Sequence, residues 1–206
     1  MTNRPALSLE GYRAVKYIDG FYDVLSHTTA SDRAGAQLDL EPAFEQISLD
    51  MAGLKAGPGK VMLIGNGGSA AIASHVQNDI CKAAGVPALV FTETSLLTAL
   101  SNDDGYETAF DYQVGLFARS GDILIVISSS GKSENLLRAS RTGAAKGCFV
   151  MTLTGFSADN PLKRLGDLNV YVPSSHYGYV ESAHAVLLHA VTDRAVAILK
   201  ERGESR

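Results

Sequence analysis

Five short apolar runs, each leading into a helical stretch, most constrain how this chain can fold. They are 60–64 (KVMLI), 87–91 (PALVF), 122–127 (DILIVI), 148–153 (CFVMTL) and 168–172 (LNVYV). Helices are expected at 69–84, 95–100, 106–118, 133–146 and 179–200. Apolar strands that alternate with helices are typical of a parallel sheet covered on both faces. The sequence therefore predicts a doubly wound, three-layer α/β sandwich with a five-stranded parallel sheet, whose ligands bind beyond the carboxyl ends of the strands.

The N-terminal part of the chain differs, because its apolar residues recur at helical spacing. Two amphipathic helices are expected, over 9–25 and 40–54, with Pro42 in the first turn of the second. The polar stretch 27–37 between them is interpreted as a loop. The two apolar stripes could cover the core or pack against another subunit.

Length and composition fit one globular domain of 206 residues, 46% hydrophobic and 19% charged. We interpret 1–206 as a single domain, with a helical segment, 1–57, ahead of an α/β core, 58–206. A net charge of −4 argues against nucleic acid as the main ligand. No apolar run approaches the roughly 20 residues that cross a bilayer, so we expect no membrane partner. Cys81 and Cys148 are expected to be free thiols, which favours a cytoplasmic protein.

The stretch ISSSGKSENL, residues 127–136, contains Gly-Lys-Ser, the end of a nucleotide-binding P-loop pattern. A P-loop also needs a glycine five positions before Gly131, where this chain has Val126 inside a predicted strand. The P-loop interpretation therefore fails. Hydroxyls and free amides at a helix N-terminus can still bind a phosphate-sized anion. The candidate residues are Ser128, Ser129, Ser130 and Ser133; an ordinary capped loop is the alternative.

A second loop, 65–70 (GNGGSA), follows the first predicted strand and opens a helix. It satisfies the dinucleotide-binding pattern G-x-G-x-x-A, and Glu93 lies where a ribose would need a carboxylate. However, the loop comes after a long helical region, and the serine loop competes for the same sheet edge. A dinucleotide needs only one such loop, so we expect no nucleotide cofactor.

Polar side chains on two predicted helices could carry chemistry. His75 and Asp79 are four residues apart on one helix face, so they could bind a metal or pair a proton donor with an acceptor. A surface ion pair is the alternative. The last predicted helix carries Glu181, His184 and His189. Because the two histidines fall on opposite sides of Glu181, these three residues are not expected to serve one centre. For each histidine, the alternative to a role in a site is burial in the core with a backbone hydrogen bond.

Several motifs together resemble the sugar isomerase (SIS) domain family, and within it the phosphoheptose isomerases. They are GNGGSAAIASH, ALSNDDGYETAF, GDILIVISSSGKSENLL, VMTLTG and VPSSHYGYVESAHAVLLHAV. The resemblance covers almost the whole chain and keeps the family's motif order. It implies a flavodoxin-like SIS fold and an aldose–ketose isomerase in heptose or glycan biosynthesis. The implied reaction converts sedoheptulose 7-phosphate to D-glycero-D-manno-heptose 7-phosphate through an enediol.

The resemblance also implies roles for residues. Asp79 and His189 match the family's base and acid, and Glu181 is a further candidate carboxylate. The implied substrate and phosphate contacts are Asn66, Gly67, Ser69, Asn102, Asp103, Ser128, Ser129, Ser130 and Ser133. One zinc ion per subunit is implied at His75, Asp79, Glu181 and His189. A homotetramer with active sites at subunit interfaces is implied as well.

The chain departs from the family pattern at two of these positions. Asp79 stands where the family has glutamate, and Glu181 stands where it has glutamine. A carboxyl group moved by one carbon–carbon bond can slow proton transfer strongly. In one interpretation the site remains active, because Glu181 compensates for the shorter side chain of Asp79 or serves as an anionic metal ligand. In the other, turnover is weakened. The alternative function is a non-catalytic SIS-domain protein that binds sugar phosphates or acts as a DnaA-initiator-associating scaffold.

Overall fold

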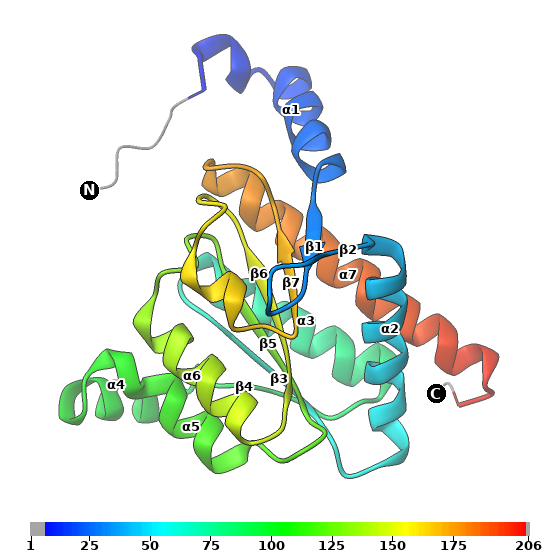
Figure 1. The fold of residues 1–206 in the computed structure, drawn as a ribbon, viewed down its shortest axis with the longest axis vertical. Coiled ribbons are helices and arrows are strands. Elements are labelled where there is room, and N and C mark those ends of the chain that lie inside the picture. The colour runs from blue at the N-terminus through cyan, green and yellow to red at the C-terminus, as the bar shows by residue number, and fades with distance from the viewer. Residues whose placement is uncertain (1–6, 205–206) are drawn as a thin grey trace.

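A seven-stranded sheet forms the centre of the protein, in the order β2-β1-β7-β6-β5-β3-β4 (Figure 1). The computed structural model describes residues 7–204. The strands are β1 (Thr29–Ser31), β2 (Gln37–Leu38), β3 (Val61–Gly65), β4 (Ala88–Val90), β5 (Ile123–Ser128), β6 (Phe149–Thr154) and β7 (Leu168–Tyr171). Strands β3 to β7 pair in parallel. The predicted parallel arrangement of these five strands is confirmed, but the sheet has seven strands rather than five.

The prediction of a plain loop over 27–37 is wrong, because this stretch contains β1 and the first residue of β2. Strand β1 pairs antiparallel with β7, and Thr29 lies opposite Tyr171. Strand β2 then pairs antiparallel with β1. Both strands are too short and polar to give an apolar run, so the sequence pattern could not reveal them. They cover the edge of β7, which would otherwise leave its backbone groups unpaired.

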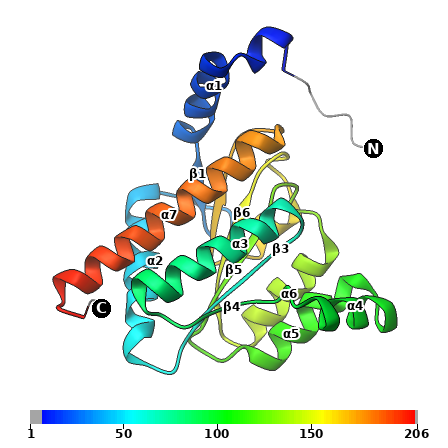
Figure 2. The ribbon, with the colours of Figure 1, turned by 180° about the vertical axis from the view of Figure 1, so that it is seen from behind.

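Helices cover both faces of the sheet. They are α1 (Ala14–Ser26), α2 (Leu40–Gly53), α3 (Gly68–Asp79), α4 (Thr94–Asp103), α5 (Ala109–Phe117), α6 (Glu134–Ala145) and α7 (Tyr177–Glu201). Alternate strand residues point to opposite faces, so the sheet shares one apolar core with α2, α3 and α7 and another with α5 and α6. Figures 1 and 2 show these two layers from opposite sides.

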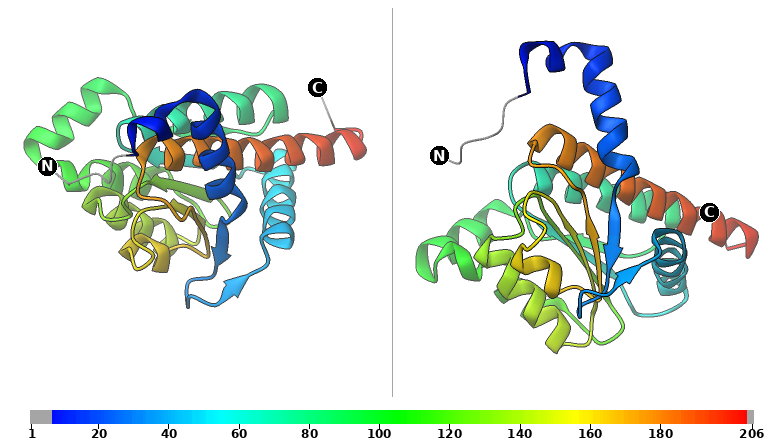
Figure 3. Two further views of the ribbon diagram at one scale, coloured as in Figure 1. Left: turned by 90° about the horizontal axis from the view of Figure 1, so that it is seen from above. Right: turned by 45° about the horizontal axis from the view of Figure 1, so that its top comes forward.

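Helix α1 stands apart from the sandwich (Figure 3). It contacts the body through aromatic rings, since the rings of Tyr17 and Phe21 lie 4.6 and 6.3 Å from that of Tyr179. Val24 and Leu25, near its C-terminal end, also pack against the core, whereas Val15 and Ile18 are open, at 70% and 63% exposed. An amphipathic helix with an uncovered apolar stripe is typical of a surface that another chain covers.

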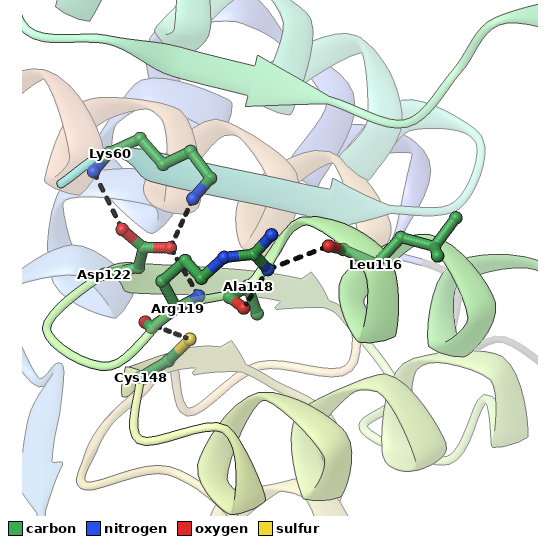
Figure 4. A network of polar contacts seen from close by, with 6 residues as sticks. All are labelled: Lys60, Leu116, Ala118, Arg119, Asp122 and Cys148. Atoms are coloured by element: carbon green, nitrogen blue, oxygen red, sulfur yellow. Dashed lines mark hydrogen bonds and ion pairs between the residues drawn. The ribbon is translucent and has the colours of Figure 1, made fainter. Parts of the chain in front are cut away.

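A buried carboxylate ties together the amino ends of the central strands (Figure 4). Asp122 accepts hydrogen bonds from the backbone amides of Lys60 and Arg119, at 3.0 and 2.8 Å, and forms an ion pair with the Lys60 ammonium. The side chain of Asp122 is only 1% exposed. Burial, and then the charge of Asp122, raise the pKa of the nearby Cys148 thiol to about 11. This network lies at the end of the sheet opposite the serine loop.

Helix α7 is the one described helix that is long and apolar enough to cross a membrane by length and composition. Half of its most apolar window is buried inside the protein, against α2 and α3. The apolar character of α7 is therefore accounted for by core packing.

Candidate functional site

A small pocket of about 90 Å³ opens at the carboxyl ends of β3 and β5. It is lined by Asn66, Ser69, Ile127, Ser128, Ser129, Ser130, Ser133, Leu136, Tyr177 and Glu181. The serine loop, the glycine loop and the start of α7 thus meet at one sheet edge, where doubly wound folds bind ligands. We call this hollow the serine pocket. Its described lining contains four serine-loop hydroxyls and one carboxylate, and no lysine or arginine.

The serine loop places hydroxyls around this pocket by a tight turn. Gly131 adopts a positive φ of 62°, and its amide donates to the Ser128 hydroxyl at 3.1 Å. Ser133 is the N-cap residue of α6, yet its side chain makes no capping hydrogen bond. Ser129 is 95% buried, and its hydroxyl has no partner among the described residues. A buried, unpaired hydroxyl is costly, so the loop is shaped for a polar group from outside the chain.

The glycine loop brings α3 up to the opposite wall of the serine pocket. Gly67 has a positive φ of 55° and is the N-cap residue of α3. A Cβ atom at Gly68 would lie 2.7 Å from the carboxylate oxygens of Glu181. The absence of a side chain at Gly68 therefore allows Glu181 to rest against the N-terminus of α3, where the helix dipole favours a negative charge.

Asn66, next to Gly67, belongs to a hydrogen-bonded group that joins three separate segments. Its side-chain oxygen accepts from the Tyr106 hydroxyl at 2.7 Å and from the Asn135 amide at 3.0 Å. Its own amide donates to the Asn135 oxygen at 3.1 Å. Tyr106 lies in a short 3₁₀ helix, Tyr106–Thr108, and Asn135 lies in the first turn of α6. Sequence analysis did not find Tyr106 or Asn135.

A second group of polar side chains lies on the outer faces of α3 and α7, which run side by side (Figure 2). One carboxylate oxygen of Asp79 lies 3.5 Å from Nε2 of His75 and 3.5 Å from Nδ1 of His189. The two imidazole rings are 5.2 Å apart. One ligand atom from each of the three residues lies within 4.8 Å of the other two. We call these residues the His-Asp-His cluster.

The donor set of the cluster fits a divalent metal ion. Two imidazoles and one carboxylate are the ligands that catalytic zinc sites use, and such sites keep a fourth position open. All three side chains are partly exposed, so a fourth ligand could approach from outside. Small rearrangements would bring the three ligand atoms to metal-bonding distance.

The structure places the predicted site residues in different groups. Glu181 lies in the serine pocket, whereas the cluster contains His75, Asp79 and His189. The reason is the helix rise: Glu181 and His189 are eight residues apart on α7, about 12 Å along its axis. The family resemblance implied that Glu181 is a ligand of the same metal ion. Within one subunit, Glu181 is not part of the His-Asp-His cluster.

Other predicted residues lie away from both groups. Asn102 and Asp103 end α4 as exposed residues that hydrogen-bond to each other at 2.8 Å. His184 is fully buried, and Nε2 lies 3.2 Å from the carbonyl oxygen of Thr154. Burial lowers the pKa of His184 to about 4, so this residue is neutral core. Within the described part of the chain, the histidines of the last helix thus have separate environments.

Glu93, the residue that a dinucleotide ribose would need, has a structural role. Its carboxylate accepts hydrogen bonds from the backbone amides of Leu96 and Ser95, at 2.8 and 3.0 Å, and so caps α4. These two bonds lower the pKa of Glu93. The G-x-G-x-x-A pattern at the glycine loop therefore lacks the free carboxylate that a dinucleotide site pairs with it.

Comparison with known proteins places this geometry among sugar isomerases. The model of the SIS domain family matches residues 30–155. A phosphoheptose isomerase of Burkholderia pseudomallei is 43% identical over 141 residues, which cover 65% of this chain and 70% of that protein. A phosphoheptose isomerase of Aliarcobacter butzleri is 36% identical over 157 residues, 73% of this chain and 82% of that protein.

Solved structures agree over a longer stretch. The phosphoheptose isomerase of Neisseria gonorrhoeae superposes with a TM-score of 0.75 and 28% identity, covering 90% of this chain and 98% of that one. The phosphoheptose isomerase of Francisella tularensis gives the same TM-score at 27% identity, covering 89% and 96%. The structural similarity therefore covers more of the chain than the part that the family model matches.

Proposed function

The chain belongs to the SIS domain family, and from this we propose that it is a sugar-phosphate isomerase. The proposed reaction converts sedoheptulose 7-phosphate to D-glycero-D-manno-heptose 7-phosphate through an enediol. Similarity to phosphoheptose isomerases supports this choice over other sugar phosphates. The observation that carries the proposal is a pocket lined by serine hydroxyls, one of them buried and unpaired, beside helices α3 and α7, which carry two histidines that share one carboxylate.

The serine pocket would hold the phosphate. Ser129 offers a buried, unpaired hydroxyl, and Ser133 leaves its N-cap position free for a ligand. The N-terminus of α6 adds backbone amides and a favourable dipole, so the phosphate needs no cationic side chain. Binding energy from this remote group would fix the reacting end of the sugar.

The length of a heptose phosphate supports the pairing of this pocket with the His-Asp-His cluster. Along α7, Glu181 in the pocket and His189 in the cluster are about 12 Å apart. A seven-carbon sugar phosphate spans more of this separation than a shorter one does. A three-carbon sugar phosphate would be too short to contact both groups.

The chemistry would be general acid–base catalysis at neighbouring carbons. The Asp79 carboxylate removes the proton from the carbon beside the carbonyl, and His189 gives or takes protons at the oxygens. Such groups typically contribute about 10²- to 10⁴-fold each. Glu181 is the alternative base, because it lies in the pocket itself. His75 on the other side of Asp79 would hold the carboxylate in position.

We propose that the cluster also holds one zinc ion per subunit, through His75, Asp79 and His189. When bound, such an ion would supply Lewis-acid stabilisation of the negatively charged oxygen. The ligand types also suit other divalent first-row metals. Glu181 is not needed for this set within one subunit.

We further propose a cytoplasmic homotetramer with active sites near subunit interfaces. The exposed apolar stripe of α1 supports an assembly, because burial against another subunit would remove this apolar surface from water. The partial exposure of the cluster supports a neighbouring subunit that completes the site. The division into one domain with a helical segment, 1–57, stays a prediction.

One experiment tests the proposed function. The purified protein is incubated with sedoheptulose 7-phosphate and with shorter ketose phosphates, with and without added zinc, and the products are identified by chromatography and mass spectrometry. We expect an aldose phosphate from the seven-carbon substrate. Absence of any aldose product under both metal conditions would overturn the enzyme proposal and favour a sugar-phosphate-binding scaffold.

A further inference from the structure

The hydrogen bonds around Asn66 fix which atoms it presents to the serine pocket. The backbone amide of Leu136 can only donate, and it lies 3.0 Å from the side-chain oxygen of Asn135. That contact identifies the Asn135 oxygen, so the other end of the Asn135 amide must be the donor to Asn66. The atom of Asn66 that accepts this bond is therefore its oxygen, and its nitrogen donates in return.

The Tyr106 hydroxyl completes this arrangement. It donates to the same Asn66 oxygen at 2.7 Å. A carbonyl oxygen has two lone pairs, and Asn135 and Tyr106 now occupy both of them. One N–H of Asn66 is used by Asn135, which leaves the second N–H for the pocket that Asn66 lines. Asn66 thus offers its ligand a donor and no free acceptor.

We propose that Tyr106 is a positioning residue that makes Asn66 a donor-only contact for the phosphate oxygens of the ligand. This inference rests on the proposed function, because it assumes an anion in the serine pocket. Without the Tyr106 hydroxyl, one lone pair of Asn66 becomes free and attracts water or turns toward the phosphate. An acceptor facing the anion is repulsive, and the amide also loses one of its fixing bonds.

In this arrangement the ring and the hydroxyl of the half-exposed Tyr106 have separate roles. Its ring packs against Phe110, with ring centroids 6.4 Å apart, while its hydroxyl reaches the glycine loop. Gly105, with a positive φ of 88°, immediately precedes it and sets the direction of the chain. The segment between α4 and α5 is therefore tied to the glycine loop and, through Asn135, to the first turn of α6.

The test compares Tyr106→Phe with the matched control Tyr112→Phe, which removes a hydroxyl from a half-exposed tyrosine of α5 outside the pocket lining. Binding of inorganic phosphate is measured by calorimetry, and KM and kcat are measured with sedoheptulose 7-phosphate. We expect Tyr106→Phe to raise the Kd for phosphate and the KM by roughly 3- to 10-fold, the size of one hydrogen bond, with kcat little changed. Tyr112→Phe should match the wild type.

A double-mutant cycle with Asn66→Ala separates positioning from a general structural effect. Because Tyr106 acts through Asn66, Tyr106→Phe should weaken phosphate binding no further in the Asn66→Ala background. Equal phosphate affinity in wild type and Tyr106→Phe, or additive losses in the double mutant, would overturn the inference. Failure of the wild type to bind phosphate would instead overturn the phosphate pocket of the proposed function.

Discussion

The carboxylate of Asp79 lies between two imidazoles, 3.5 Å from His189 on a neighbouring helix and 3.5 Å from His75 on its own. Aspartate is one methylene shorter than glutamate, yet here it contacts both histidines. The close packing of α3 against α7 accounts for this reach. The shorter side chain is therefore compatible with an acid–base pair, and its contribution to turnover can be measured.

Asp79→Asn should lower kcat by about 10²-fold or more and change KM little, because the amide cannot take a proton. Ser130→Ala, in the serine pocket, should show the opposite pattern: a KM raised by about 5-fold, for one lost hydrogen bond, and a nearly unchanged kcat. Steady-state kinetics with sedoheptulose 7-phosphate distinguish the two. A larger kcat loss for Ser130→Ala than for Asp79→Asn would contradict these roles.

Glu181→Gln should leave the zinc content of the protein unchanged, because Glu181 lies in the serine pocket and not in the cluster. His75→Ala should lose bound zinc. Elemental analysis of the purified variants makes the comparison. Glu181→Gln should also bind inorganic phosphate more tightly, by about 3-fold or more, since a negative charge is removed beside the anion. Loss of zinc in Glu181→Gln would show that Glu181 is a ligand in the assembled protein.

Asp122→Ala should destabilise the protein by about 3 kcal/mol, because it leaves two partly buried backbone amides and the Lys60 ammonium without their acceptor. Urea unfolding of the wild type and the variant measures this. The control is Arg33→Ala, which breaks an exposed ion pair with Asp167 and should cost less than about 1 kcal/mol. Similar losses in the two variants would mean that the buried network is not a main source of stability.

Stability should fall in mild acid through His184. In the folded protein its pKa is about 4, below the ordinary histidine value of 6.5, so the unfolded chain binds the proton first as the pH falls. The contribution of His184 to the free energy of unfolding, about 3 kcal/mol in total, is complete above pH 6.5 and is lost as the pH falls toward 4. Denaturation curves measured between pH 7 and pH 4 give the free energy of unfolding at each pH. Its decrease with falling pH should be smaller in His184→Gln than in the wild type, whereas His27→Gln, at an exposed position, should show the wild-type decrease.

Ile18→Asp should shift the protein to smaller assemblies, because it places a charge in the apolar stripe of α1. Light scattering coupled to size-exclusion chromatography measures the mass. Lys16→Asp, on the same helix and also exposed, is the control and should retain the wild-type mass. An unchanged mass for Ile18→Asp would leave α1 without a role in assembly.

Much of the fold could be predicted because burial on both faces leaves a strong pattern. The runs at β3 and β5 are continuous and apolar, and each ends in a polar loop. Strands β1 and β2 could not be predicted, because β1 gains its stability from pairing with β7 and β2 from pairing with β1, and neither carries an apolar run of its own.

The site was predictable only where its residues follow a strand end or share a helix face. Ser129 follows β5, and His75 and Asp79 are one turn apart. Tyr106 and Asn135 come to Asn66 from distant segments, so no spacing could point to them. The place of Glu181 depends on the relative positions of α3 and α7, which the sequence alone does not give.

The missing side chain at Gly68 makes two distant positions depend on each other. Any larger residue there would displace the Glu181 carboxylate, which lines the serine pocket. An engineer who adds a side chain at position 68 must therefore shorten the residue at position 181 as well, whereas an isosteric change at position 181 needs no change at position 68.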